Sequence, residues 1–350
     1  MEVQEKNSEK ITILWQASRL TLAGEYVTAP EILRVHGSPI GTLGNFSASI
    51  GKAKSKKTFN VSAIVAAALK NGTVLQYDAE LPENKRKVLY VDTEQSPYHC
   101  QKVMRRIVRM AGLPLDEEPH NLEFLSLRRH TPDVRIAIVE KAIYQTEGLG
   151  LVIIDGIRDM VYDINSPSES TKIISKLMQW TDERQIHIHT ILHQNKADEN
   201  ARGHIGTELN NKAETVLEVA KDKIDNDIST VKAVHIRAMD FQPFAFRIND
   251  DALPELVKDY AFEKKSGKSK YYNYSELKEE QHRQALEATF SEKESYGYGE
   301  FTEALRRGYA TIGCKYGENK IGDLKLFLEK NGMIVKDLAR KYLYNPNFHY

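Results

Sequence analysis

The sequence predicts an α/β protein built on a mostly parallel sheet flanked by helices, followed by a smaller helical unit. Between about residues 40 and 250, short apolar runs alternate with longer amphipathic runs, as they do in βα units. The stretch LGLVIIDG at 149–156 is continuously apolar, which is typical of a strand covered on both faces. Three strand candidates then follow one another without helices between them, from residue 214 onward. This order predicts a parallel sheet extended by antiparallel strands.

The predicted elements follow in order along the chain. Each strand candidate is a short apolar run, and each helix candidate is a longer amphipathic one. The first helix ends at a glycine, Gly72. Strands are predicted at 42–50, 87–94, 122–127, 149–156, 186–194, 214–222, 229–240 and 243–249, and helices at 57–72, 98–112, 132–148 and 170–185.

A polar and charged stretch at 263–281 is weakly periodic and indicates a linker. The chain beyond it has three short helix candidates and a final β-ribbon candidate. These lie at 284–290, 298–309, 319–332 and 333–345. We therefore expect four parts: an N-terminal segment without an assigned structure, a large α/β domain, a linker and a small C-terminal domain. Their boundaries are 1–30, 31–260, 261–283 and 284–350.

Composition excludes several classes of protein. The chain has 350 residues, with 49 Lys and Arg against 49 Asp and Glu, so the total charge gives no argument for nucleic-acid binding. The N-terminus has no apolar run like that of a signal peptide, and no stretch is long enough for a membrane helix. The two cysteines, Cys100 and Cys314, are far apart and lack metal-ligand spacing. We expect a soluble cytoplasmic protein.

A phosphate-binding loop is predicted at GKAKSKKT, residues 51–58. The general pattern is G-x-x-x-x-G-K-[ST], in which backbone N–H groups, a helix N-terminus and one lysine face the phosphates. A strand candidate precedes the loop, a helix candidate follows it, and Thr58 stands at the position of a Mg²⁺ ligand. The predicted nucleotide contacts are Gly51, Lys52, Ala53, Lys54, Ser55, Lys56, Lys57, Thr58 and Phe59.

Lys56 departs from this pattern, because a glycine is usual at its position. The replacement matters if the backbone there must be left-handed, or if a side chain would collide with a phosphate. A left-handed conformation costs a non-glycine residue about 1–2 kcal/mol, which contacts with a ligand can offset. The alternative is an exposed lysine-rich turn that binds no nucleotide.

Two acidic side chains are expected beside the loop. Asp155 lies at the carboxyl end of its strand, where α/β sheets place ligands, and we expect it to hold Mg²⁺ together with Thr58. Glu94 lies at another strand end and is expected to polarise the attacking water. Asp92 is its rival, although it lies within the alternation of the strand. For Asp155, the alternative without function is a buried strand that ends in an acid by chance. For Glu94 and Asp92, the alternative is two solvated acids at a loop.

Polar residues at two later strand ends complete the predicted site. His193 and Gln194 end the strand candidate at 186–194, and Gln194 is expected to hydrogen-bond the γ-phosphate. Arg237 is expected to act on the γ-phosphate of a neighbouring subunit, with an ordinary surface charge as the alternative. The polar, glycine-punctuated stretch 200–214 predicts a loop that changes between order and disorder. In that loop, Arg202 and His204 are candidate contacts to single-stranded DNA.

In their order and spacing, the loop, Glu94, Asp155, the His193–Gln194 pair and Arg237 resemble the RecA-like ATPase core. The likeness is to the plasmid RepA and DnaB-type hexameric helicase branch and its relatives on mobile elements, and it covers about residues 30–250. It implies ATP and Mg²⁺ as ligands, Lys57, Glu94, Gln194 and Arg237 as catalytic residues, and a homo-oligomeric ring, a hexamer, around DNA. One further departure is that this branch often carries a Lys-x-Arg pair on a late strand. Here Met239 stands two residues after Arg237, so only one member of the pair is assigned.

The order of helices and ribbon at 284–345 resembles a winged helix-turn-helix. If its third helix enters the major groove of duplex DNA, the residues at the start of that helix face bases and phosphates. From 296 to 350 there are nine basic and six acidic residues, a small excess that weakens a case based on phosphate contacts. The alternative is a module that binds protein. The candidate DNA contacts are Lys315, Tyr316, Asn319, Lys320 and Lys336.

Three functions remain open at this point. The first is an ATP-dependent DNA motor, a helicase-like ATPase in the replication or mobilisation of a mobile element. The second is a nucleotide-switched DNA-binding accessory protein with little or no hydrolysis. The third is a structural adaptor whose loop no longer binds nucleotide.

Overall fold

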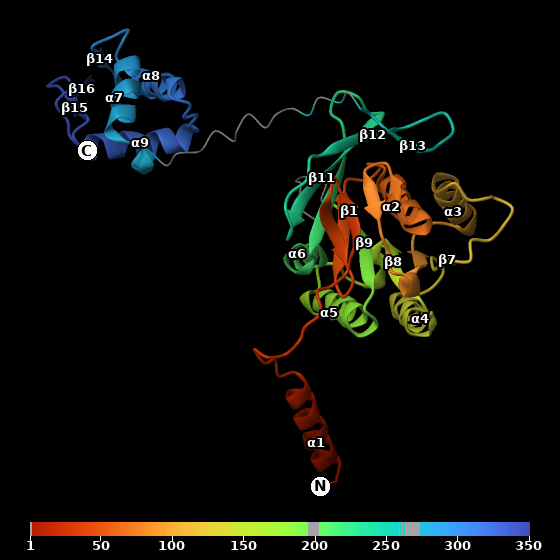
Figure 1. Ribbon diagram of the computed structural model, residues 1–350. Helices are drawn as coiled ribbons and strands as arrows, with labels where there is room; N and C mark the ends of the chain where they lie inside the picture. Colours follow the sequence, from red (N-terminus) through yellow and green to blue (C-terminus); the bar gives the residue numbers. More distant parts are fainter. Residues whose placement is uncertain (1, 195–202, 259, 261, 263–273) are drawn as a thin grey trace. The chain divides into compact units, whose positions relative to one another are not determined.

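The computed structural model describes residues 2–194, 203–258, 260, 262 and 274–350 (Figure 1). The chain forms two compact units, Met1–Tyr260 and Ala261–Tyr350. The first unit is a mixed α/β structure, and the second contains three helices and a small sheet among its described residues. Within the described ranges, none of the helices combines the length and the apolar character that crossing a membrane requires.

A nine-stranded sheet forms the centre of the first unit, in the order β13-β12-β11-β10-β3-β9-β8-β6-β7. The strands from β10 to β7 are parallel, whereas β11, β12 and β13 are antiparallel. The predicted mostly parallel sheet with antiparallel strands at one side is therefore confirmed. The strands are β3 (Phe46–Gly51), β6 (Lys87–Asp92), β7 (Leu122–Ser126), β8 (Leu149–Asp155), β9 (His187–His193), β10 (Thr215–Lys221), β11 (Ile228–Ile236), β12 (Phe244–Ile248) and β13 (Pro254–Leu256).

Helices cover both faces of this sheet (Figure 1). On one face, Ile64 of α2 and Val103 of α3 join a buried apolar cluster with the sheet. On the other face, Val139 of α4, Trp180 of α5 and Leu209 of α6 join a second cluster. The helices of this unit are α1 (Glu2–Ala17), α2 (Lys57–Lys70), α3 (Pro97–Ala111), α4 (Pro132–Gln145), α5 (Pro167–Arg184) and α6 (Gly203–Lys212), with the 3₁₀ turns η1 (Glu83–Lys85) and η2 (Ile157–Met160).

A second, four-stranded sheet packs on α2 and was not predicted from the sequence. Its strands have two to five residues and are joined by tight turns, so none shows a long enough alternation to predict. The predicted strand at 42–50 begins too early, since Thr42 is the last residue of β2 in this small sheet and β3 begins only at Phe46. The strand order is β2-β1-β5-β4, with β1 (Glu31–Val35), β2 (Ser38–Thr42), β4 (Thr73–Val74) and β5 (Tyr77–Ala79).

The predicted loop at 200–214 is corrected by the structure, because residues 203–212 form α6. Ile205 and Leu209, one helical turn apart, are fully buried beneath this helix. Gly203 has a positive φ of 74°, and a Cβ there would lie 2.6 Å from the Ile164 carbonyl oxygen. The glycine is thus explained by a close approach between segments rather than by an irregular loop.

The second unit contains α7 (Glu279–Thr289), α8 (Tyr298–Thr311) and α9 (Glu318–Lys330), preceded by the short turn η3 (Tyr274–Glu276). The apolar residues expected between its helices, Phe301 and Leu324 among them, lie in one buried cluster. A small sheet follows α9, in the order β14-β16-β15, with β14 (Ser295–Tyr296), β15 (Ile334–Lys336) and β16 (Tyr342–Tyr344). The first helix begins before residue 284, inside the stretch that was expected to be a linker.

Candidate active site

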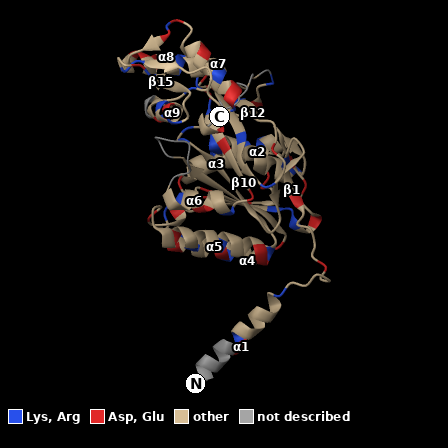
Figure 2. Cartoon of the chain, turned by 90° about the vertical axis from the view of Figure 1, so that its left-hand side faces the viewer, with Lys and Arg blue, Asp and Glu red and all other residues tan. Residues whose placement is uncertain are grey.

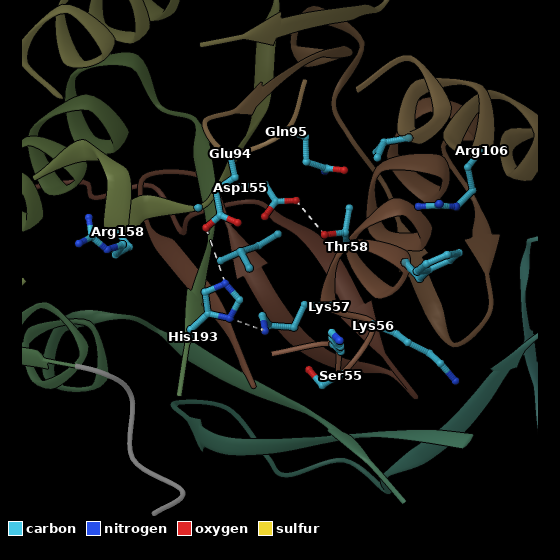
Figure 3. Close-up of a pocket in the computed structure, with 15 residues that line it drawn as sticks. Ser55, Lys56, Lys57, Thr58, Glu94, Gln95, Arg106, Asp155, Arg158 and His193 are labelled. Atoms are coloured by element: carbon cyan, nitrogen blue, oxygen red, sulfur yellow. Dashed lines mark hydrogen bonds and ion pairs between the residues drawn. The ribbon is translucent and has the colours of Figure 1, made fainter. Parts of the chain in front are cut away.

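A cavity of about 250 Å³ opens at the carboxyl ends of β3, β6, β8 and β9 (Figure 3). Residues at the ends of β8 and β9 and in the segments after β3, β6 and β8 line it, and helices α2 and α3 supply the rest. Parallel strands bring their carboxyl ends to one edge of the sheet, where α/β proteins place ligands. The cavity is lined by Lys54, Ser55, Lys56, Lys57, Thr58, Phe59, Glu94, Gln95, Val103, Arg106, Asp155, Gly156, Arg158, Ile191 and His193.

The phosphate-loop sequence connects β3 to α2 at this cavity. Gly51 is packed so tightly that a Cβ there would lie 2.2 Å from the Val219 carbonyl oxygen. Ser55 lines the cavity with 2% of its surface exposed, and its buried hydroxyl has no hydrogen-bond partner among the described residues. Such a group is costly to bury unless a ligand or water satisfies it. Lys52 and Ala53 are exposed and do not line the cavity.

Lys56 has the left-handed backbone that a glycine would adopt most easily, with φ 67° and ψ 29°. Its ammonium group donates a hydrogen bond of 2.6 Å to the carbonyl oxygen of Asp227, which precedes β11. This bond offsets part of the cost of about 1–2 kcal/mol for a left-handed lysine. The unusual residue therefore keeps the backbone shape of the loop and adds a contact to the segment between β10 and β11.

Lys57 begins α2 and is 6% exposed. Its ammonium group donates to the carbonyl oxygens of Gly51 and Lys52, at 2.7 and 3.0 Å, and lies 3.1 Å from Nδ1 of His193. Burial lowers the pKa of Lys57 to about 8, and the negative charges of Asp155 and Glu94 act in the opposite direction. A buried cation at a helix N-terminus is suited to bind phosphate.

Asp155 ends β8 and faces the first turn of α2. Its Oδ2 accepts hydrogen bonds from Thr58 Oγ1 at 3.1 Å and from Tyr90 OH at 2.9 Å. Burial, with the charge of Asp92 nearby, raises the pKa of Asp155 to about 7. A divalent cation would favour its carboxylate form. The structure thus brings together the two residues expected to hold Mg²⁺.

Glu94 lines the cavity, whereas its rival Asp92 is buried beside it. Asp92 Oδ1 accepts hydrogen bonds from the backbone N–H groups of Glu94 and Gln95, at 3.0 and 2.7 Å, and so fixes the turn that carries Glu94. Nε2 of His193 lies 3.6 Å from Glu94 Oε1. The His193 ring is the main cause that lowers the pKa of Glu94 below its usual range.

The structure does not bring Gln194 to the cavity, which corrects the expected contact with the γ-phosphate. Successive side chains of a strand point to opposite faces, so His193 faces the cavity and Gln194 is buried behind it. Gln194 Nε2 donates a 2.6 Å hydrogen bond to Glu218 Oε1. Arg237 follows β11 at the end paired with the start of β10, away from the phosphate loop of its own chain. Its guanidinium donates to the Lys212 carbonyl oxygen.

Three polar or charged side chains of the cavity were not predicted from the sequence: Gln95, Arg106 and Arg158. Gln95 follows Glu94 directly and Arg158 stands three residues after Asp155, so their nearness in the sequence to these two acids could have indicated them. Arg106 gave no such signal, because it is one of several basic residues along α3. Only the packing of α3 against α2 shows that it faces the cavity.

Some of the expected DNA contacts are exposed, one is buried and two lie outside the described residues or side chains. His204, Lys315, Lys320 and Lys336 are exposed, whereas Tyr316 is 4% exposed within the core of the second unit, which corrects its expected role. Lys336 Nζ lies 2.9 Å from Glu329 Oε1. Arg202 and the side chain of Asn319 lie outside the described residues. Figure 2 shows basic and acidic residues interspersed on α5 and α7, not gathered by sign.

The residues present fit a nucleoside triphosphate with Mg²⁺. The unpaired hydroxyl of Ser55 and the ammonium of Lys57 are donors suited to phosphate oxygens. Thr58 and Asp155 are oxygen ligands of the kind that Mg²⁺ prefers. Glu94 is a carboxylate placed to accept a proton from water.

A known protein family and a solved structure are similar to this chain. No curated protein matches the sequence. A crystal structure of the RadB recombinase is similar to the chain, with a TM-score of 0.43 and 16% identity, over 60% of this chain and 90% of that one. The AAA domain family matches residues 17–199, which is more than half of the chain and includes Lys57, Glu94 and Asp155. This protein therefore belongs to the AAA domain family, which supports the expectation of a RecA-like P-loop ATPase.

Proposed function

We propose that the protein is an ATP-dependent DNA motor, a helicase-like ATPase. The observation that supports this most is that Lys57, Thr58, Glu94 and Asp155 surround one cavity at the carboxyl edge of the sheet. A site that only binds nucleotide needs the phosphate loop and no catalytic carboxylate. Glu94 is held beside the cavity by its turn and by His193, which is the arrangement that hydrolysis needs.

In the proposed reaction, Lys57 and the N-terminus of α2 bind the β- and γ-phosphates and stabilise the charge that develops on them. Glu94 accepts a proton from the attacking water, and the water oxygen displaces ADP from the γ-phosphorus. Thr58 and Asp155 would hold Mg²⁺, which supplies charge neutralisation when bound. His193 orients Glu94 and keeps it ionised, since its ring lowers the carboxyl pKa.

DNA as the partner is the finer part of the proposal. The RecA-like resemblance supports single-stranded DNA in a ring of six subunits, with Arg237 acting on a neighbour's nucleotide. The order of α7, α8, α9 and the small sheet supports a winged helix that binds duplex DNA through Lys315, Lys320 and Lys336. A role in mobile-element replication rests on the resemblance alone.

ATP turnover with and without single-stranded DNA tests this function. We expect turnover that DNA stimulates, and its loss in Lys57→Ala, because the charge opposite the phosphates is removed. Lys70→Ala is the matched control, since this lysine at the other end of α2 is exposed and does not line the cavity. Unchanged turnover in Lys57→Ala would remove the mechanism.

The second candidate is a nucleotide-switched DNA-binding protein with little hydrolysis. The strained backbone of Lys56 favours it, because a loop held by a bond to Asp227 can bind phosphate while turning over slowly. ATP binding without turnover, in the presence and absence of DNA, would establish this alternative. A structural adaptor would bind no ATP at all.

A further inference from the structure

Three tyrosines of the second unit each have a lysine ammonium group over the ring. The six residues lie on or beside the small sheet and on the helices α8 and α9. Basic side chains interleaved with aromatic rings are typical of surfaces that bind single-stranded nucleic acid. The distance from the ammonium nitrogen to the ring centroid is 5.8 Å for Lys293 and Tyr296, 3.4 Å for Lys325 and Tyr298, and 4.8 Å for Lys336 and Tyr342.

Tyr298, the first residue of α8, is the accessible ring of the three. It is 71% exposed, whereas Tyr296 and Tyr342 are each 3% exposed. Gly297 and Gly299 stand on either side of it, and a Cβ at either position would have no heavy atom within 4 Å. The space around Tyr298 is therefore open. Single exposed rings are common on protein surfaces, so this exposure needs a second observation before it indicates a function.

The second observation is the burial of Lys325 beneath this ring. Lys325 is 5% exposed, and its ammonium group contacts the rings of Tyr298 and, at 5.4 Å, Tyr342. Within the described part of the second unit, no carboxylate pairs with it. A buried cation without a counter-ion is costly, and a ring face offsets only part of that cost. Lys325 thus fixes one face of Tyr298, leaves the other face to solvent, and favours an anionic ligand there.

The turn between β15 and β16 adds positive charge to the same cluster. Arg340 and Lys341 are exposed and form no ion pair among the residues that the structure describes. The acid of this turn, Asp337, accepts a hydrogen bond of 2.8 Å from the backbone N–H of Lys341. Lys341 directly precedes Tyr342, whose ring contacts Lys325. An exposed ring and cations beside it are complementary to the bases and phosphates of one DNA strand.

We infer that the second unit binds single-stranded DNA, with an unpaired base stacked on the outer face of Tyr298. Arg340 and Lys341 contact the phosphates of that strand. A base inside a duplex is covered on both faces by its neighbours, so the ring selects nucleotides outside a duplex. The inference rests on DNA as the partner in the proposed function, and it adds a single-strand site to the unit for which duplex binding is proposed.

Photo-crosslinking of the full chain to single-stranded DNA locates the stacked base. The probe is a thymine oligonucleotide in which iodouracil replaces some of the thymines, because iodouracil crosslinks efficiently to an aromatic ring that is stacked on it. We expect the crosslinked peptide to contain Tyr298. Crosslinks confined to other residues would overturn the inference.

The affinities for the same oligonucleotide and for a blunt duplex, measured by fluorescence anisotropy, give the size of the effect. We expect Tyr298→Ala to weaken binding of the single strand by a factor of about 5 to 100, the range for losing one stacked base. The duplex should bind as before, which also shows that the variant is folded. Tyr298→Phe keeps the ring and should bind both forms like the unaltered protein.

Tyr98 on α3 offers a matched control. It is 62% exposed and has the Lys102 ammonium 4.6 Å from its ring centroid, but this lysine is itself exposed. Tyr98→Ala should change neither affinity. Equal weakening of both DNA forms in Tyr298→Ala, or no weakening of the single strand, overturns the inference.

The two proposals fail in different ways. If the unaltered protein binds neither DNA form, DNA as the partner in the proposed function fails, and the single-strand site fails with it. If DNA stimulates ATP turnover but no crosslink forms at Tyr298, the single-strand site alone is wrong.

Discussion

Nδ1 of His193 lies 3.1 Å from the Lys57 ammonium, and Nε2 of the same ring lies 3.6 Å from the Glu94 carboxylate. One imidazole at the end of β9 therefore joins the residue expected to bind phosphate to the residue expected to activate water. Because the start of α2, the turn after β6 and the end of β9 supply these three side chains, the connection depends on the order of strands in the sheet.

The pH dependence of turnover should show this connection. Glu94 acts as a base only when ionised, so turnover falls as the pH drops through its pKa. His193 is the main cause that lowers this pKa, and His193→Ala should therefore move the acid limb of the kcat profile to higher pH. His235→Ala, an exposed histidine on β11, is the control. An acid limb at the same pH in both variants would contradict the pairing.

Asp92 should matter for turnover without touching the ligand. Asp92→Ala leaves the N–H groups of Glu94 and Gln95 without their acceptor and lets Glu94 move. We expect kcat to fall on the order of 10- to 100-fold, the effect of displacing a catalytic group by a fraction of an ångström to one ångström. Asp92→Asn retains the acceptor at Oδ1 and should recover most of the rate. Equal loss in both variants would indicate a role for the charge itself.

Gly51 should not accept a side chain. A Cβ would lie 2.2 Å from the Val219 carbonyl oxygen and 2.6 Å from Ser55 Oγ, so Gly51→Ala forces β3 and β10 apart. We expect the free energy of unfolding to fall by about 1–3 kcal/mol, measured by urea denaturation with Trp180 fluorescence in a Trp15→Phe background. Gly72→Ala is the control in the same unit, because the added carbon would meet only Lys70 Cγ at 3.9 Å, and it should not destabilise the protein.

The stability of the first unit should decrease in acid because of His189. This ring is fully buried between Ser47 Oγ and Ser49 Oγ, at 2.7 and 2.8 Å, and burial lowers its pKa from 6.5 to about 3. Below pH 6.5 the unfolded chain binds a proton that the folded state does not. Stability is therefore present above pH 6.5 and is lost as the pH falls toward 3, by at most about 1.4 kcal/mol per pH unit.

Urea denaturation at several pH values between 7 and 4 measures this loss, again with Trp180 as the reporter. His189→Gln removes the titrating group and keeps a polar side chain between the two serines. We expect a shallower dependence on pH in this variant, even if its stability at pH 7 is lower. An identical slope in the two proteins would assign the acid sensitivity to other groups.

The site residues that could be predicted from the sequence are those that stand at the boundary of a clearly predicted strand or helix. Each of Lys57, Glu94 and Asp155 stands at the end of a clear strand or the start of a clear helix, and parallel strands bring such positions together. Arg106 was not predictable, because its place depends on how α3 rotates against α2. Gln194 was misassigned because the ladder between β3 and β9, with Gly51 opposite His193, decides which of two adjacent polar residues faces the cavity.

The same distinction holds for the fold. Eight strands of the nine-stranded sheet were predicted from apolar runs, whereas the three-residue strand β13 was not. The four-stranded sheet depends on pairing between short segments distant in the sequence, such as Leu33 and Ala79. Helix α6 was missed because two glycines and three polar amide or hydroxyl side chains conceal the spacing of Ile205 and Leu209. Its backbone conformation is set by tertiary packing against Ile164 and α5.

The hydrogen bond from the Lys56 ammonium to the Asp227 carbonyl oxygen means that the conformation of the octapeptide at 51–58 does not depend on its own sequence alone. It is also stabilised by the turn before β11, more than 170 positions further along the chain. Grafting the octapeptide onto another scaffold would therefore lose that support, and shortening the turn before β11 would loosen a loop that no alignment of the octapeptide would connect with it.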